Sequence, residues 1–336
     1  MHSRIRRIVV AASAGVLATT LAACSGSATG RPAEVGGPRG PEPPVSGARP
    51  ATPEDYPRLS TAPACDPRRS LTPPATLPAP GRMPAGSTME TIRTRGYLIV
   101  GVDQNTRFFA ELNRRSHEIE GFDIDMAKAL AKAIFGTGPD GDERIRYKVV
   151  TQAQRIAVLT TGQVDVVIDT MTITCARKQQ VAFSSDYYTD GQRVLVRYDS
   201  GVTGLAQLRG KRVCTVRATT SIAFLRDDPA GVLPYAVDNW TDCLVALQQG
   251  EVDAISTTSA LLAGLRAQDP DTEVVGRPFT DEPHGMAFPL ANQDFVRFAN
   301  GLLERMKRDG SWQALYDRWL AGPLGAQPPP AASYAD

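Results

Sequence analysis

One pattern occurs twice in this chain of 336 residues, and it limits the folds open to it. The two copies read "AVLTTGQVDVVI" from Ala157 and "VALQQGEVDAIS" from Val245. In each copy a helix with apolar periodicity ends, and Gly162 or Gly250 stands where a left-handed C-cap is needed. Val-Asp and a short, buried-looking strand then follow. The sequence therefore predicts two lobes built in the same way.

Each predicted lobe also begins with a strand that runs into polar residues, at 97–106 and at 211–220. After the first strand we expect a helix over 121–135, and after the second a helix capped by a hydroxyl from 219–221. Four apolar residues of the first helix recur on one face: Phe122, Met126, Leu130 and Ile134. Strands that alternate with helices indicate an α/β fold with parallel sheets.

The carboxyl ends of parallel strands carry the loops in which α/β proteins bind their ligands. In this chain those loops are 103–109, 169–174, 217–221 and 256–259, and Thr is concentrated at three of them. Two such lobes facing each other would form a cleft lined by these loops. The alternative is that they are ordinary solvated loops.

The stretch "DVVIDTMTITCARKQQVAFS", residues 165–184, shows this change in character most clearly. Its apolar residues give way to Thr170, Thr172 and Thr174, Arg177 follows, and apolar residues resume at Val181. We interpret it as a strand that ends in a binding loop.

The N-terminus resembles the signal of bacterial lipoproteins, with a cationic start, an apolar stretch and "LAAC" ending at Cys24. The resemblance implies that residues 1–23 are removed and that the thiol of Cys24 carries lipid. Residues 24–86 are rich in Pro and Gly with few large apolar residues, which predicts a disordered tether. Residues 322–336 predict a disordered tail.

Several stretches in order carry a more specific resemblance: "RGYLIVGVD", "GFDIDMAKALA", "GQVDVVIDTMTITCARKQQVAFS", "LRGKRVCTVRATTS", "GEVDAIS" and "FANGLLERMKRDGSWQALYDRWL". Together they resemble the amino-acid-binding class of ABC-transporter solute-binding proteins, family 3, and look closest to actinobacterial glutamine-binding lipoproteins. The match runs from Ser87 to Leu320.

This resemblance implies a type II periplasmic-binding-protein fold, in which two lobes joined by two hinge strands close on a ligand. Lobe 1 would take residues 87–191 and 283–321, and lobe 2 residues 192–282. The hinge would lie near 190–192 and 282–286.

The resemblance also implies how an amino acid is held. Arg177 corresponds to the family's arginine that grips the α-carboxylate with two parallel hydrogen bonds, a geometry that Lys cannot supply. Thr172 from lobe 1 and Thr220 from lobe 2 would add hydroxyl donors. Thr219 and Thr220 also stand at the start of a helix, where free N–H groups favour an anion. Thr170 lies in the same loop as Thr172.

The family's usual partner of the ammonium group is missing, because Thr258 stands where the family usually has an Asp. A hydroxyl accepts a hydrogen bond from an ammonium but does not neutralise it. We hypothesise that Asp169, at the end of a lobe 1 strand, supplies the missing charge.

Residues near the first strand end should select the ligand's side chain. Asp103 corresponds to a polar, ligand-facing position, and Phe108 or Phe109 would form an aromatic wall. Arg107 and Arg217 stand near the mouth of the cleft. If both point inward the pocket suits glutamate or aspartate, and if both point outward it suits an amide such as glutamine.

With Cys24 assigned to lipid, Cys65, Cys175, Cys214 and Cys243 remain, and an even number in an exported protein favours disulfides with three possible connectivities. A bridge between Cys214 and Cys243 would close a loop of about 30 residues, worth on the order of 3.5 kcal/mol. That pairing would leave Cys65 with Cys175, beside Arg177.

The sequence therefore predicts a monomeric binding protein for glutamine, glutamate or aspartate, lipid-anchored on the extracytoplasmic face of the membrane, that delivers its ligand to an ABC importer. A ligand-dependent sensor that signals to a membrane protein is the first alternative. A dehydratase-like enzyme is the second, but the predicted pocket holds no His and few carboxylates.

Composition excludes other classes of function. A net charge of +1 with scattered basic residues argues against nucleic-acid binding. Three His residues and the lack of a Cys-x-x-Cys motif argue against a metal site, and we expect no cofactor.

Overall fold

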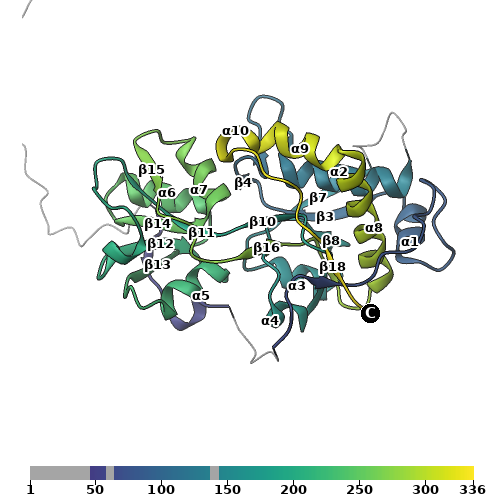
Figure 1. Ribbon diagram of the computed structural model, residues 1–336, viewed down its shortest axis with the longest axis horizontal. Helices are drawn as coiled ribbons and strands as arrows, with labels where there is room; N and C mark the ends of the chain where they lie inside the picture. The colour runs from purple at the N-terminus through teal and green to yellow at the C-terminus, as the bar shows by residue number, and fades with distance from the viewer. Residues whose placement is uncertain (1–45, 58–63, 137–143) are drawn as a thin grey trace, which may run out of the picture. The chain divides into compact units, whose positions relative to one another are not determined.

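The computed structural model describes residues 46–57, 64–136 and 144–336. In this part of the chain two lobes, each with its own central sheet, are linked by strands β10 (Tyr188–Asp190) and β16 (Glu282–His284) (Figure 1). These two strands pair antiparallel, with Tyr188 opposite His284 and Asp190 opposite Glu282. The predicted two-lobed α/β fold with two connecting strands is confirmed.

Lobe 1 contains a five-stranded sheet of β7 (Ile145–Val149), β3 (Leu98–Val102), β8 (Val166–Val167), β17 (Ala287–Pro289) and β9 (Val181–Phe183), in that order. Strand β3 runs parallel to β7 and β8, as predicted. Strand β17 runs antiparallel to β8 and β9, so the sheet is mixed. The reason is that β17 returns from lobe 2 and enters the sheet from the opposite end.

The remaining elements of lobe 1 cover this sheet and complete a core. Its helices are α1 (Thr88–Arg95), α2 (Phe122–Phe135), α3 (Arg155–Thr160), α4 (Cys175–Lys178), α8 (Gln293–Asp309), α9 (Ser311–Trp319) and α10 (Ala321–Leu324). A small sheet joins β4 (Asn105–Thr106), β5 (Ala110–Leu112) and β6 (Ile119–Glu120). The four apolar residues predicted on one face of α2 are all fully buried in the core.

Lobe 2 contains a six-stranded sheet of β1 (Arg49–Pro50), β13 (Leu233–Val237), β12 (Arg212–Val216), β14 (Ala254–Thr258), β11 (Gln192–Arg197) and β15 (Thr272–Val275). The central strands β13, β12 and β14 are parallel, and β11 runs antiparallel to β14. The helices of lobe 2 are η2 (Leu205–Leu208), α5 (Thr220–Asp227), α6 (Trp240–Gln248) and α7 (Ser259–Arg266).

The local signals read from the repeated pattern hold in both lobes. Gly162 and Gly250 have φ values of +66° and +71°, the left-handed conformation that ends each helix. Thr219 is the N-cap of α5, and its hydroxyl accepts a hydrogen bond from the Ile222 amide at 3.3 Å. Both features depend only on neighbours in the sequence, which is why the sequence could predict them.

The prediction of a disordered tether over 24–86 is wrong for the residues of this range that the structure describes. Residues 49–50 form β1 on the edge of the lobe 2 sheet, where Arg49 lies opposite Ala236. Further along, β2 (Arg69–Ser70) follows, and the Ser70 hydroxyl donates to the Phe183 carbonyl at 2.8 Å. The segment has few apolar residues and forms no core of its own. It is ordered because it pairs with the lobes.

The prediction of a disordered tail over 322–336 is also wrong. Strand β18 (Ser333–Tyr334) pairs parallel with β2, so the tail and residues 69–70 hold each other on lobe 1. The Tyr334 hydroxyl donates to Glu304 of α8 at 2.8 Å. Lys307 of α8 also donates to the Pro330 carbonyl at 2.7 Å. These contacts come from residues 23 or more positions away, which composition does not reveal.

Both predicted disulfides are present, Cys214–Cys243 and Cys65–Cys175, with Cα–Cα distances of 5.6 and 5.8 Å. The predicted signal peptide and Cys24 lie outside the described residues. Among the helices of the described ranges, none has the length and apolar character needed to span a bilayer.

Candidate functional site

Loops from the two lobes meet at the predicted cleft. The Thr172 hydroxyl of lobe 1 lies 3.4 Å from the Thr220 hydroxyl of lobe 2. Around this contact the lobes enclose a small cavity of about 20 Å³, lined by Arg155, Thr170, Thr172, Thr219, Thr220 and Thr258 among others. This volume is close to that of one water molecule, so the lobes touch at this part of the cleft.

A larger cavity of about 740 Å³ lies next to the small one and shares Gln152, Arg155 and Thr220 with it. Its lobe 1 wall includes Met171 and Arg177. Arg177 lines only this larger cavity of the two, so a ligand held by its guanidinium would occupy the larger space.

Arg177 is positioned by the short helix α4 and the residues before it. Thr174 is the N-cap of α4, and its hydroxyl accepts a hydrogen bond from the Arg177 amide at 3.2 Å. The guanidinium is buried, and its Nη1 donates to the Thr172 carbonyl at 2.6 Å. Burial, with a smaller effect from the nearby Arg155 charge, lowers the pKa of Arg177 to about 9. An anion placed here would offset both effects.

Asp169 is buried and turned toward Arg155. Its Oδ2 lies 3.9 Å from Arg155 Nε and has no hydrogen-bond partner among the described residues. The Asp169 carbonyl accepts a hydrogen bond from Arg155 Nη1 at 2.8 Å. Burial raises the pKa of Asp169 well above its usual value, and the Arg155 charge opposes that rise. Asp169 lines neither cavity, so its predicted role stays a hypothesis.

The next residue in the loop, Thr170, has a strained backbone with φ +41°. Its amide donates to Asp123 Oδ2 at 2.9 Å, and the Tyr187 hydroxyl donates to Asp123 Oδ1 at 2.7 Å. Burial raises the pKa of Asp123 to about 7 despite these two hydrogen bonds. Asp123 therefore fixes the backbone of the binding loop at Thr170.

The predicted specificity residues near the first strand end do not reach these two cavities. The Asp103 carboxylate is used by its own turn, since it accepts hydrogen bonds from the Gln104 amide at 2.7 Å and the Thr106 hydroxyl at 2.5 Å. Phe108 packs on the edge of the lobe 1 core, with φ +72°, and Phe109 is fully buried in that core.

The two mouth arginines also have partners elsewhere. The Arg107 guanidinium carbon lies 5.5 Å from the centre of the Phe108 ring, and its Nη1 is 3.8 Å from Glu111. Arg217 Nε lies 2.6 Å from Asp238, and both side chains are substantially exposed. Neither arginine points into the cleft cavities, which is the arrangement expected for an amide ligand.

Two residues that the sequence assigned only to the hinge, Glu282 and His284, lie beside the site. The carboxylate of Glu282 is buried and accepts hydrogen bonds from the Thr220 hydroxyl and Gln192 Nε2, both at 3.1 Å. Its negative charge opposes the lowering of the Arg177 pKa that burial and Arg155 cause. The stretch "DEPHGM" carries no motif that could have assigned Glu282 to binding.

His284 lies two residues further on and forms an isolated antiparallel bridge with Thr172. It is buried, and neither ring nitrogen has a hydrogen-bond partner among the described residues. Burial, reinforced by the charges of Arg155 and Arg177, lowers the pKa of His284 to about 3. A neutral imidazole therefore lies close to both guanidinium groups.

Two α/β lobes joined by two strands, with a buried guanidinium on the wall of a cavity lined by both lobes, define the class of two-lobed ligand-binding proteins. The chain belongs to the bacterial extracellular solute-binding proteins, family 3, whose model matches residues 98–322.

Relatives with known names agree with this class. The chain is 35% identical to the ABC transporter glutamine-binding protein of Bacillus subtilis, over 69% of this chain and 84% of that protein. It is 39% identical to a glutamine-binding protein of Geobacillus stearothermophilus, over 63% of this chain and 79% of that protein. Among solved structures it is similar to an ancestral arginine-binding protein bound to glutamine, with a TM-score of 0.61 and 33% identity over 69% of this chain and 99% of that one.

Proposed function

We propose that this protein binds a polar amino acid between its lobes, with the α-carboxylate on Arg177. The observation that carries this proposal is the buried Arg177 guanidinium on the wall of the larger cavity, across from Thr220. A guanidinium presents two parallel donors to a carboxylate, and burial strengthens that interaction. Thr220 of lobe 2 lines the same cavity and would add a hydroxyl donor, and Thr172 of lobe 1 lines the adjoining small cavity.

A ligand that enters between Thr172 and Thr220 requires the lobes to separate, because these two hydroxyls lie 3.4 Å apart. The motion would take place at β10 and β16, the two strands that join the lobes. Gly191 and Gly285, one beside each strand, allow the backbone rotations of a hinge.

Glu282 and Asp169 are the buried carboxylates whose charges act on Arg177, and each could pair with the ligand's ammonium group. Glu282 already accepts a hydrogen bond from the hydroxyl of Thr220, one of the proposed donors. Its charge also raises the pKa of Arg177 against the effect of burial. Asp169 already faces Arg155, and neither Glu282 nor Asp169 lines either cavity. We therefore favour Glu282, and we retain Asp169 as the alternative.

Glutamine is the amino acid we favour. The outward-facing contacts of Arg107 with Glu111 and of Arg217 with Asp238 provide no inward cation for an acidic side chain. Two relatives named for glutamine, at 35% and 39% identity, support the same choice.

We further propose that the protein acts outside the cytoplasmic membrane, anchored through lipid on Cys24, and delivers its ligand to an ABC importer. The lipoprotein-like "LAAC" motif supports the anchor. The name of the Bacillus subtilis relative supports the importer. Metabolic labelling with a fatty-acid analogue tests the anchor, since Cys24→Ala should lose the label.

The carboxylate anchor is tested by calorimetry after a thermal-shift screen of the twenty amino acids. Binding to the folded state raises the melting temperature. Arg177→Lys keeps the charge but loses the two-pronged donor, so we expect the affinity for the ligand to fall at least about 100-fold. Arg217→Lys is the matched control and should bind as the wild type does. A screen in which no amino acid raises the melting temperature contradicts the proposal.

The ammonium partner is tested by comparing Glu282→Gln with Asp169→Asn. Each change removes a charge while keeping the size of the side chain. We expect Glu282→Gln to lose most of the affinity for glutamine and Asp169→Asn to lose less. The reverse order would assign the ammonium to Asp169.

A further inference from the structure

Residues 46–57 precede the region matched by the family model, which begins at residue 98, yet they lie against the proposed ligand site. Glu54, Tyr56 and Pro57 line the 740 Å³ cavity together with Arg177. The remaining walls come from lobe 1, including Met171, and from lobe 2, including Ala223. The cavity is therefore completed by a third segment of the chain.

This segment is firmly attached to lobe 2. Strand β1 pairs with β13, and the Ala51 amide donates to the Pro234 carbonyl at 2.9 Å. Asp55 is 1% exposed and receives both terminal nitrogens of Arg49 at 2.7 Å. The same carboxylate also accepts a hydrogen bond from the Thr52 amide at 2.7 Å. Asp55 is buried and the Arg49 side chain is half exposed, and this hydrogen-bonded ion pair holds the following residues in one place.

The segment also contacts the loop that carries Thr219 and Thr220. The Asp55 carbonyl accepts a hydrogen bond from the Ala218 amide at 2.6 Å. Ala218 has φ +59°, a left-handed conformation that is unfavourable for a residue with a Cβ atom. The N-terminal segment thus stabilises an unfavourable backbone directly before two proposed ligand-binding residues.

Tyr56 is the aromatic residue of this wall. The guanidinium carbon of Arg226 lies 4.8 Å from the centre of its ring and keeps the ring on the lobe 2 side of the cavity. Neither Phe108 nor Phe109 lines the cavity, although the sequence predicted an aromatic wall from one of them. Tyr56 supplies that wall from a different part of the chain.

We propose that the segment Glu54–Pro57 is part of the ligand site and that Tyr56 determines specificity, by packing on the methylene groups of an amino acid held by Arg177. This inference rests on the proposed function. It deepens that function by naming the preferred ligand class: amino acids with an unbranched chain of two or more methylenes and a polar end, such as glutamine.

The test measures selectivity as well as affinity. Calorimetry with glutamine, and with alanine at millimolar concentrations, is carried out on the wild type, Tyr56→Ala and Tyr56→Phe. We expect Tyr56→Ala to lose about tenfold or more in affinity for glutamine and less than about threefold for alanine. Tyr56→Phe keeps the ring and should bind both ligands as the wild type does. Tyr198→Ala, at a side chain that is 70% exposed, is the matched control.

The outcomes separate this inference from the proposed function. Wild-type affinity for glutamine in Tyr56→Ala would overturn the role of Tyr56 and leave amino-acid binding intact. An equal loss for glutamine and alanine would also overturn it, because that result indicates only a displaced loop. A wild-type protein that binds neither ligand would overturn both the proposed function and this inference. Melting temperatures of all variants show whether each one is folded.

Discussion

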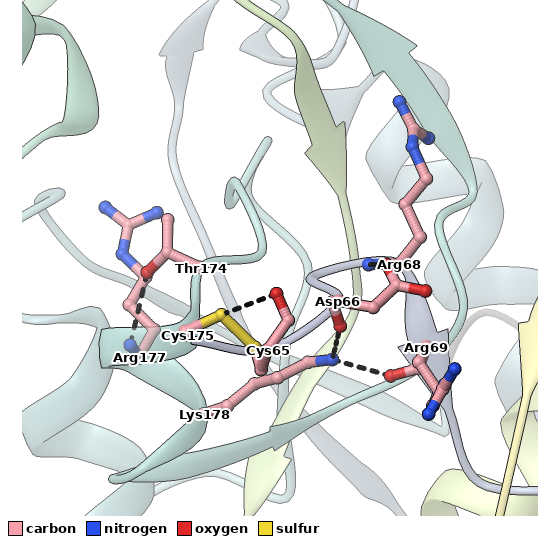
Figure 2. The surroundings of a disulfide bond; sticks show 8 residues. All are labelled: Cys65, Asp66, Arg68, Arg69, Thr174, Cys175, Arg177 and Lys178. Carbon is pink, nitrogen blue, oxygen red and sulfur yellow. Dashed lines mark hydrogen bonds between the residues drawn. A yellow bond between two sulfur atoms is a disulfide. The ribbon is translucent and has the colours of Figure 1, made fainter. Parts of the chain in front are cut away.

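The two disulfides of this protein lie in contrasting surroundings. Cys214–Cys243 joins β12 to α6 within lobe 2, spans 29 residues, and is fully buried in the lobe 2 core. Cys65–Cys175 spans 110 residues and joins the N-terminal segment to the first residue of α4, two residues before Arg177 (Figure 2). Cys65 is exposed and Cys175 partly so.

The exposed bridge is part of a cluster that holds α4 in place. Lys178, in the last turn of α4, donates to the carbonyls of Asp66 at 3.1 Å and Arg69 at 2.6 Å (Figure 2). A helix of four residues has little stability of its own. We therefore expect the buried bridge to stabilise a lobe and the exposed bridge to position the proposed carboxylate anchor.

The largest effect is expected from removing the buried bridge. In the double variant Cys214→Ala/Cys243→Ala, the free energy of unfolding should fall by about 3.5 kcal/mol, because the denatured chain regains the freedom of a loop of 29 residues. Urea unfolding measures the loss. Affinity for glutamine, at a temperature where the variant is folded, should stay within about threefold of the wild type. A large loss of affinity without a loss of stability would contradict the purely stabilising role of this bridge.

The dependence of stability on pH tests the surroundings of Arg177 through its buried neighbour His284. The pKa of His284 is about 3 in the folded protein and 6.5 ordinarily, because burial and the charges of Arg155 and Arg177 disfavour the imidazolium. Below pH 6.5 the unfolded chain binds a proton that the folded protein does not. Stability should therefore fall as the pH falls, by up to about 1.4 kcal/mol per pH unit from this residue.

His284→Gln removes this contribution, so the variant should gain stability relative to the wild type between pH 6.5 and pH 4. The difference between the two proteins is the quantity to measure, because Asp123, with a pKa raised to about 7, titrates in the opposite sense. The same difference should appear when His284→Gln is made in the protein without Cys214 and Cys243. Parallel stability curves for the variant and the wild type would contradict the assignment.

Removing the exposed bridge should weaken binding more than folding. For Cys65→Ala/Cys175→Ala we expect about a tenfold loss of affinity for glutamine, because α4 is released beside Arg177. The loss of unfolding free energy should be smaller than for the buried bridge, although the closed loop of 110 residues is longer. The reason is that the residues around Cys65 can detach locally from lobe 1 without unfolding either lobe. A larger loss of stability than in the Cys214/Cys243 variant would show that the segment unfolds together with the lobes.

The smallest effect is expected at Lys178. Lys178→Met removes the two hydrogen bonds to the N-terminal segment and leaves the disulfide intact, so affinity for glutamine should fall about threefold. Arg209→Met is the matched control, because the Arg209 side chain donates to the Pro229 carbonyl in lobe 2, away from α4. Equal affinities of the two variants would mean that the disulfide alone positions α4.

The lobes were predictable because their signals are local. The repeated helix–glycine–strand pattern depends on side-chain periodicity and on the left-handed glycines 162 and 250, both of which act within a few residues. The order of residues 46–57 was not predictable from composition. It depends on partners far away in the sequence, such as Ala236 opposite Arg49. Composition predicts disorder for a segment with few apolar residues, because composition does not show the sheet edge with which the segment pairs.

The sequence by itself determined two α/β lobes, the capping of α5 by Thr219, and the placing of Thr172, Thr220 and Arg177 at the cleft. Only the tertiary structure decided where the charges point. It turned Asp169 toward Arg155, brought Glu282 from the hinge to Thr220, and added Tyr56 to the cavity wall. The physical reason is that helix ends and strand ends follow from neighbouring residues. The direction and partner of a buried charge depend instead on segments that meet only in the folded chain.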